Sequence, residues 1–348
     1  MNRQRLFFPD LLRVVAAFLV VLIHVTSIGI QDAPVSSKLW CVSMVLNSIS
    51  RWSVPVFFMI SGMFLLNPEY NVPLKKLYRK NISRIALCIV VWGFFYSLLD
   101  QYQYGGLSLK SPFVAVYGIL TDNTGYHLWF LYTLLALYIA TPTLRVFTAN
   151  ASEGQVRYAV AVWFVFCVCF GAVNRMASAF LDIDGFLPDG AVVIVGSAGY
   201  YLLGYYLHRY PIPGKLVPVL YVLSAACFCA IPVLNVCFPR AGIQVGFSEW
   251  MGIGSFAIAS GVFVFASRLR EEVLPERFCN TVRWFSDRSF GIYLIHVFYV
   301  SLIFRILNSG ILNIVPELSV LGSTIVIFLL SSMTSSVFNR IKGLKQLV

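Results

Sequence analysis

Long apolar runs separated by short polar segments are the feature of this sequence that most restricts its fold. A transmembrane helix needs about 20 consecutive, mostly apolar residues. Such runs recur along the whole chain, so the sequence predicts an all-α, polytopic integral membrane protein with about ten transmembrane helices. The expected ranges are 10–30, 40–66, 82–102, 127–147, 157–177, 190–208, 216–237, 246–267, 289–309 and 317–338.

The composition excludes most soluble classes. Hydrophobic residues make up 59% of the 348 residues and charged residues 12%, against about 45–50% and about 25% in soluble domains. No hydrophilic stretch is long enough to form a second domain, so residues 1–348 are expected to be a single transmembrane domain. The net charge of +11 would suggest nucleic acid in a soluble protein, but its distribution follows the membrane, and no nucleic-acid partner is predicted.

The positive charges predict the topology. With a cytoplasmic N-terminus, the segments on the inner side and their flanks carry 19 of the 26 Lys and Arg residues. This positive-inside bias favours an even number of helices with both termini inside. The first apolar run follows Arg3 and Arg5, but it is too long for a signal peptide, so we expect an uncleaved helix.

The first helix carries a polar stripe. Arg13 and His24 are eleven positions apart, which at about 100° per residue places them on one face, and Asp10 lies within about 40° of His24, so all three are candidate catalytic residues. His24 is roughly 16 Å beyond Arg13. A histidine can act as a general base or an acyl-accepting nucleophile, and an arginine can bind phosphate or polarise a carbonyl. The alternative is a structural histidine with Arg13 reaching to the interface.

Further polar residues follow in the second and fourth helices. Arg51 is expected near mid-membrane, where it could reach the level of His24 and stabilise an oxyanion. Ser61 is a weaker candidate for contact with the acceptor, because helix packing is the favoured interpretation of the small residues there. His127 either contacts the acceptor or caps a helix, and Trp129 either lines the site or belongs to the aromatic belt at the membrane interface.

Two other groups are candidates for binding the donor. The loop after the second helix is basic, which suits either anionic lipid or the phosphates of a cytoplasmic donor. Tyr293 and His296 share a helix face with Ser289 and would line a cavity from the cytoplasmic side, although a polar cluster between helices is slightly favoured. The basic candidates are Lys75, Lys76, Arg79, Lys80 and Arg84.

Five motifs together resemble the membrane-bound acyltransferase family 3. They cover nearly the whole chain in the family's order, and two of them are most similar to the enterobacterial common antigen and O-antigen O-acetyltransferase branch. The motifs are Arg13 and His24 with ten residues between them, the stretch 53–62, the basic loop ending at Arg84, His127-Leu128-Trp129-Phe130, and the stretch 289–296.

The resemblance implies an activity and a location. It implies transfer of an acetyl group from cytoplasmic acetyl-CoA to a hydroxyl of a cell-surface polysaccharide or its undecaprenyl-linked precursor, in the bacterial inner membrane. His24 would be the catalytic base or acyl carrier, with Arg13 as its partner. No extracytoplasmic SGNH hydrolase-like domain, bound cofactor or metal is expected. The oligomeric state is not predicted.

Two functions of other classes remain open at this point. A proton-coupled transporter or lipid flippase also buries Arg and His among its helices. A noncatalytic partner in envelope assembly would tolerate changes at Arg13 and His24.

Overall fold

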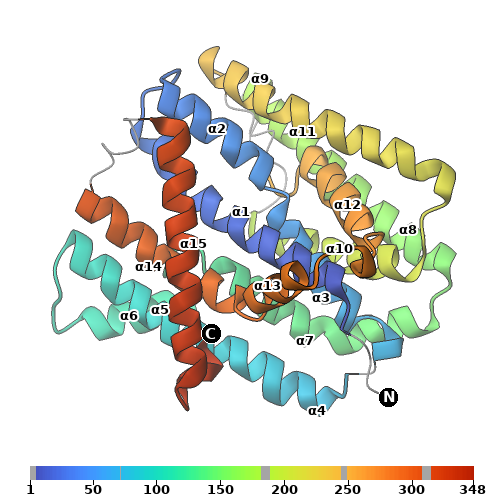
Figure 1. Cartoon of the computed structure of the whole chain (residues 1–348), viewed down its shortest axis with the longest axis horizontal. Coiled ribbons are helices and arrows are strands. Elements are labelled where there is room, and N and C mark those ends of the chain that lie inside the picture. Colours follow the sequence, from blue (N-terminus) through green and yellow to red (C-terminus); the bar gives the residue numbers. More distant parts are fainter. Residues whose placement is uncertain (1–4, 71, 182–188, 244–248, 308–314) are drawn as a thin grey trace.

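A computed structural model describes residues 5–70, 72–181, 189–243, 249–307 and 315–348, and all regular elements in these ranges are helices (Figure 1). The α-helices are α1 (Phe7–Asp32), α2 (Lys38–Ser50), α3 (Ser53–Leu65), α4 (Leu74–Lys76), α5 (Ser83–Tyr104), α6 (Ser111–Leu120), α7 (Trp129–Asn150), α8 (Glu153–Trp163), α9 (Phe170–Leu181), α10 (Asp189–Arg209), α11 (Val217–Arg240), α12 (Ile253–Ser267), α13 (Glu276–Ser286), α14 (Ser289–Leu307) and α15 (Pro316–Arg340).

The expected all-α membrane architecture is confirmed. Within the described residues, seven helical stretches are long and apolar enough to cross a membrane, or eight if α13 and α14 form one bent span. These eight match eight of the ten expected ranges. The other two ranges coincide with α10 and with α12, which has 15 residues. The count of ten and the orientation stay predictions.

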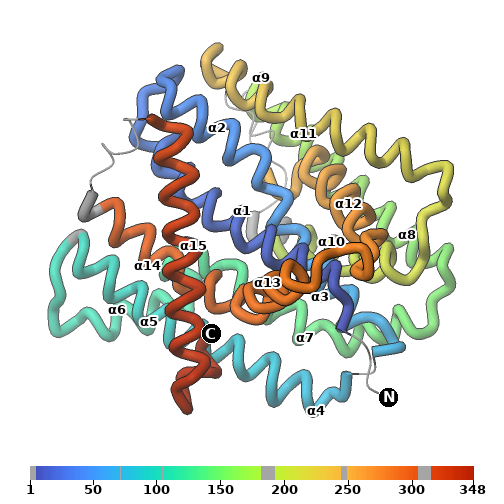
Figure 2. The backbone as a smooth tube through the Cα atoms, viewed as in Figure 1, coloured from blue at the N-terminus to red at the C-terminus, as the bar shows by residue number. Residues whose placement is uncertain are grey.

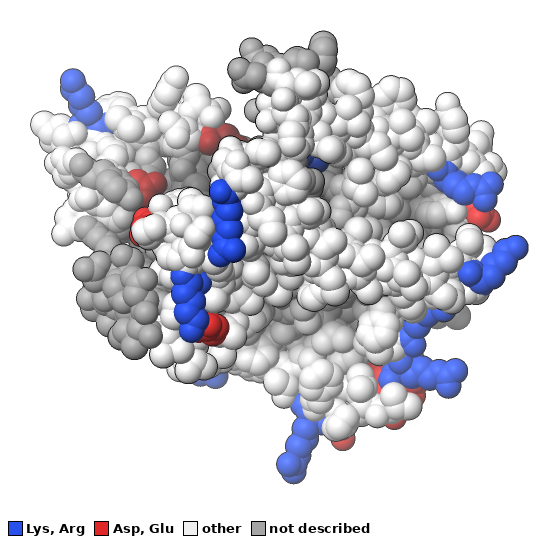
Figure 3. Space-filling model, turned by 90° about the horizontal axis from the view of Figure 1, so that it is seen from above, with Lys and Arg blue, Asp and Glu red and all other residues white. Residues whose placement is uncertain are grey.

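Helix α1 lies at the centre of the bundle. It packs against α2, α3, α13, α14 and α15, and its blue tube is surrounded by these elements in Figure 2. In contrast, large apolar side chains such as Phe113 and Leu181 are exposed on the outside. The face in Figure 3 is mostly uncharged, with scattered Lys, Arg, Asp and Glu.

The second expected helix is broken at its middle. Pro55 has no backbone N–H and therefore cannot bond the carbonyl of Arg51, four residues earlier. Helix α2 accordingly ends at Ser50, and α3 begins at Ser53. The break places Arg51 at the end of a helix inside the bundle, where its side chain is only partly exposed.

Glycines allow α3 and α10 to touch through their backbones. A Cβ atom on Gly62 would lie 1.7 Å from the Tyr201 carbonyl oxygen, and one on Gly204 would lie 2.0 Å from the Met59 carbonyl oxygen. Small residues permit such close crossings in membrane helices. The packing role expected for the small residues of the second apolar run is therefore confirmed at Gly62.

Candidate functional site

A cavity of about 1240 Å³ runs between α1, α3, α5, α7 and α14. The exposed residues Arg79, Lys80 and Arg84 form its basic mouth, and His24 and His127 belong to the same lining. Its volume exceeds the range of about 300–1,000 Å³ that is usual for small-molecule pockets. The cavity can therefore hold a large ligand with an anionic end.

Helix α1 supplies two polar groups to this cavity, Arg13 and His24. Both lie on its wall, which confirms the prediction that they share a face. The guanidinium carbon of Arg13 lies 5.5 Å from the centroid of the Phe64 ring. Arg13 and His24 thus border the same cavity, and Arg13 has the apolar Phe64 ring beside it.

Three of the four histidines meet at the inner end of the cavity. The ring centroids of His24 and His296 are 4.9 Å apart, those of His127 and His296 5.5 Å, and those of His24 and His127 6.4 Å. His208 lies elsewhere, beside Tyr70. His296, a candidate either for facing the donor or for the slightly favoured polar cluster between helices, packs against His24. Within the described residues, no group of His, Cys, Asp and Glu is arranged to hold a metal ion.

Helix α14 is tied to this cluster by hydrogen bonds. The Tyr293 hydroxyl donates to the His127 carbonyl at 2.6 Å, and His296 Nδ1 donates to the Tyr293 carbonyl at 2.7 Å. Tyr293 also lines the cavity, whereas His296 is fully buried. The single face predicted for these two residues is observed, at the histidine end of the site.

Arg51 is held beside His24 by an amide that sequence reasoning did not select. Asn47 accepts from Arg51 Nε at 2.8 Å, and its Nδ2 donates to the Ile23 carbonyl at 3.1 Å and to Thr26 Oγ1 at 2.9 Å. These bonds fasten α2 to the turn of α1 that carries His24. The guanidinium group of Arg51 is close enough to interact electrostatically with the His24 imidazole.

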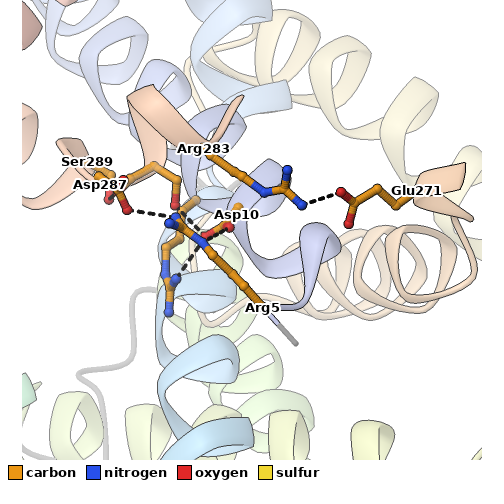
Figure 4. A network of polar contacts seen from close by, with 8 residues as sticks. Arg5, Asp10, Glu271, Arg283, Asp287 and Ser289 are labelled. Carbon is orange, nitrogen blue, oxygen red and sulfur yellow. Dashed lines mark hydrogen bonds and ion pairs between the residues drawn. The ribbon is translucent and has the colours of Figure 1, made fainter. Parts of the chain in front are cut away.

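Asp10 lies outside the cavity lining, in a polar network at the start of α1 (Figure 4). It accepts hydrogen bonds from Arg5 Nε, from Ser286 Oγ at 2.7 Å and from Arg13 at 3.3 Å. Arg5 also donates to Asp287 at 2.7 Å. Hydrogen bonding to Asp10 raises the pKa of the Arg5 guanidinium. This geometry suits a carboxylate that orients Arg13.

The basic mouth is shared with the segment after α15. Gly343 has φ of 100°, a conformation that favours glycine, and turns the chain towards the cavity. Arg84 donates to the carbonyls of Gln346 and Val348, and Trp92 Nε1 donates to the Leu347 carbonyl at 2.9 Å. Two of the basic residues expected to bind the donor, Lys75 and Lys76, lie on α4, exposed and outside the lining.

Aromatic side chains line part of the cavity wall. Trp129 lines the cavity and stacks on Trp250, with ring centroids 5.4 Å apart. Ser61 lines it too, next to the Tyr138 hydroxyl. Tyr126 is 5.1 Å from the His24 ring by centroids. Neither Tyr126 nor Tyr138 was predicted, because nothing in their local sequence sets them apart from interface aromatics.

Comparisons with known proteins identify the family. The sequence pattern of acyltransferase family 3, described as an acyltransferase domain, matches residues 6–336. An amino-acid racemase from Enterococcus faecalis is 34% identical over 128 residues, which are 35% of this chain and 17% of that protein. The match thus spans about a sixth of that relative's length. No solved structure matches significantly. The family pattern covers nearly all of the polytopic bundle, and the chain therefore belongs to acyltransferase family 3.

Proposed function

We propose that this membrane acyltransferase moves an acetyl group from cytoplasmic acetyl-CoA to a hydroxyl of a cell-surface polysaccharide or its undecaprenyl-linked precursor, in a bacterial inner membrane. One observation carries the proposal. A single cavity joins a basic mouth at Arg79, Lys80 and Arg84 to an imidazole at His24. Acetyl-CoA has the matching arrangement, with phosphates at one end and a thioester at the other.

The donor would bind along this cavity. Guanidinium and ammonium groups bind phosphate through charge-assisted hydrogen bonds, which assigns the phosphates to Arg79, Lys80 and Arg84. The pantetheine arm would pass Arg13, whose side chain is 33% exposed and still bonded to Asp10. Arg13 can therefore donate to an amide carbonyl or phosphate of the donor while Asp10 fixes its position.

Two routes of transfer are compatible with His24. In direct transfer, a ring nitrogen of His24 takes the proton of the sugar hydroxyl while the hydroxyl oxygen attacks the thioester carbonyl. The C–S bond then breaks, and the CoA sulfur leaves with the proton from His24. In the second route, His24 itself attacks the thioester, releases CoA and passes the acetyl group to the hydroxyl.

Arg51 is suited to stabilise the charge that develops in either route. Both routes pass through a tetrahedral intermediate whose oxygen carries negative charge, and preorganised donors lower its energy. Asn47 binds Arg51 through Nε, so the remaining guanidinium N–H groups could donate to an oxyanion at His24, although Arg51 is not one of the residues that line the cavity. Trp129, Ser61 and His127 remain candidates for contact with the acceptor sugar.

The decisive experiment is acetyl transfer by purified protein reconstituted in lipid vesicles. Wild type, His24→Ala and His208→Ala would receive labelled acetyl-CoA and a membrane glycolipid extract. His208→Ala is the matched control, because this histidine lies outside the cavity lining. We expect label on glycan with wild type and His208→Ala and none with His24→Ala, although all three proteins insert.

Other outcomes would change the assignment. Near-normal transfer by His24→Ala would remove His24 from the chemistry. Folded wild type that transfers no label with any extract would favour a transporter or flippase, which moves its substrate without acetyl-CoA.

A further inference from the structure

The fully buried His296 has only one free hydrogen-bonding position. Its Nδ1 lies 2.7 Å from the Tyr293 carbonyl and 3.2 Å from the Ile292 carbonyl. Carbonyl oxygens only accept, so Nδ1 carries the proton, and in the neutral ring Nε2 is a lone-pair acceptor. Nε2 has no hydrogen-bond partner among the described residues. An unsatisfied buried acceptor is costly, which points to a partner supplied during function.

Two imidazoles lie near enough to supply the missing donor, and His24 is the nearer. The rings of His24 and His296 are 4.9 Å apart by centroids and inclined by 39°, whereas the ring of His127 is 5.5 Å from that of His296. A modest rotation of the His24 ring can bring one of its N–H groups to about 3 Å from Nε2 of His296. His24 has space for this rotation, because it borders the cavity.

The surroundings of His24 lack the group that usually orients a catalytic histidine. In many hydrolytic sites a carboxylate accepts from one ring nitrogen and fixes the tautomer. The described groups that act electrostatically on His24 are His296 and Arg51, and neither is a carboxylate. A neutral acceptor does the same task without placing another charge inside the membrane, where charges are costly.

We propose that His296 is a positioning residue for His24, a role that rests on the proposed function. His296 accepts a hydrogen bond from one nitrogen of His24, so the other nitrogen is unprotonated and faces the cavity. When that nitrogen takes the hydroxyl proton, both nitrogens of His24 carry hydrogen, and the bond to His296 stabilises the cation. His296 itself gains and loses no proton.

Two substitutions separate this role from simple filling of space. His296→Leu keeps an apolar side chain of similar size but has no acceptor. His296→Gln places an amide oxygen near the position of Nε2. We expect His296→Leu to lower kcat by about 10²-fold, within the range of acid–base contributions, with KM for acetyl-CoA nearly unchanged. The kcat of His296→Gln should be about tenfold higher than that of His296→Leu, because the amide oxygen restores an acceptor. His208→Leu is the matched control and should keep wild-type kcat.

Each result bears on one proposal. If the folded wild-type protein transfers no acetyl group, the proposed function is wrong, and the positioning role of His296 falls with it. Active wild type with an undiminished kcat in His296→Leu would overturn the role alone. Equal losses in folded His296→Leu and His296→Gln would show a structural role, since the acceptor would then not matter. A raised KM with unchanged kcat would overturn the positioning role and favour the alternative that His296 binds the donor.

Discussion

At the scale of single residues, the two arginines of the site depend on buried partners. Asn47 and Asp10 are 2% and 1% exposed and hold Arg51 and Arg13, respectively. An arginine side chain has many rotamers, and fixing one of them costs entropy. The hydrogen bonds to the buried partners offset this entropy loss during folding, so the guanidinium groups are already positioned when a substrate binds.

The role of Asn47 can be tested against Asn235, an amide of α11 that also binds α2. Asn47→Leu frees Arg51, so we expect kcat to fall about tenfold or more, while KM for acetyl-CoA changes little. Asn235→Leu is the control, because Asn235 donates to Ser48 Oγ at 2.8 Å and also joins α2 to a neighbouring helix. Each variant should lose about 1–3 kcal/mol of stability. Similar kcat values for the two variants would contradict a specific role of Asn47.

Asp10 is expected to affect stability as well as activity. Asp10→Asn removes the charge that binds Arg5 and Arg13 but keeps the shape of the side chain. We expect a loss of about 1–3 kcal/mol, measured as a lower thermal midpoint in detergent, with a partial loss of kcat. Full loss of transfer at unchanged stability would support the catalytic role for Asp10 that its place on one helix face with Arg13 and His24 suggested.

The sequence predicted relations within a helix better than relations between helices. Arg13 and His24 could be placed on one face because helical periodicity alone relates them. The approach of His127 and His296 to His24 depends on where α7 and α14 cross α1, which no local pattern encodes. For the same reason Asn47 appeared as one polar residue among several in the second apolar run.

At the scale of elements, irregular helices surround the cavity. Helix α2 ends before Arg51, a π-helical turn covers Leu77–Ile82 at the basic mouth, and α13 meets α14 at an angle of 64°. Such irregularities often occur at functional sites. Only the first had a visible signal, Pro55, and the range 40–66 was still predicted as one helix.

Because α3 and α10 touch at glycines, we expect Gly62→Ala to lower the stability of the protein much more than Gly322→Ala. Gly62→Ala forces a methyl group against the Tyr201 carbonyl, so α3 and α10 must separate, and we expect a loss of at least about 2 kcal/mol. Gly322→Ala in α15 is the control, because a Cβ atom there meets no other atom within 4 Å. The control should be neutral or slightly more stable. Thermal unfolding of both variants in the same detergent measures the difference.

At the scale of the whole molecule, both ends of the described chain contact residues that line the cavity. The network of Arg5, Asp10 and Asp287 secures the start of α1 (Figure 4), and residues 345, 346 and 348 line the cavity mouth. The sequence predicted a cytoplasmic tail but not its docking, because the docking bonds use backbone carbonyls, which carry no sequence signal.

The docked segment and the proposed donor would compete for Arg84. Its guanidinium binds the carbonyls of Gln346 and Val348, and the same guanidinium is assigned to the phosphates of acetyl-CoA. Trp92→Phe keeps an aromatic ring but removes the N–H that binds the Leu347 carbonyl. Losing one hydrogen bond of about 1 kcal/mol should release the segment more often and lower KM for acetyl-CoA by up to about fivefold, with kcat unchanged.

A second substitution shows whether Arg84 carries this effect. Arg84→Gln should raise KM for acetyl-CoA, and Trp92→Phe should then add nothing, because the group for which the two ligands compete is gone. Additive effects in the double variant would mean that the segment acts on the donor site by another path. A KM that rises in Trp92→Phe alone would instead make the docked segment part of the donor site.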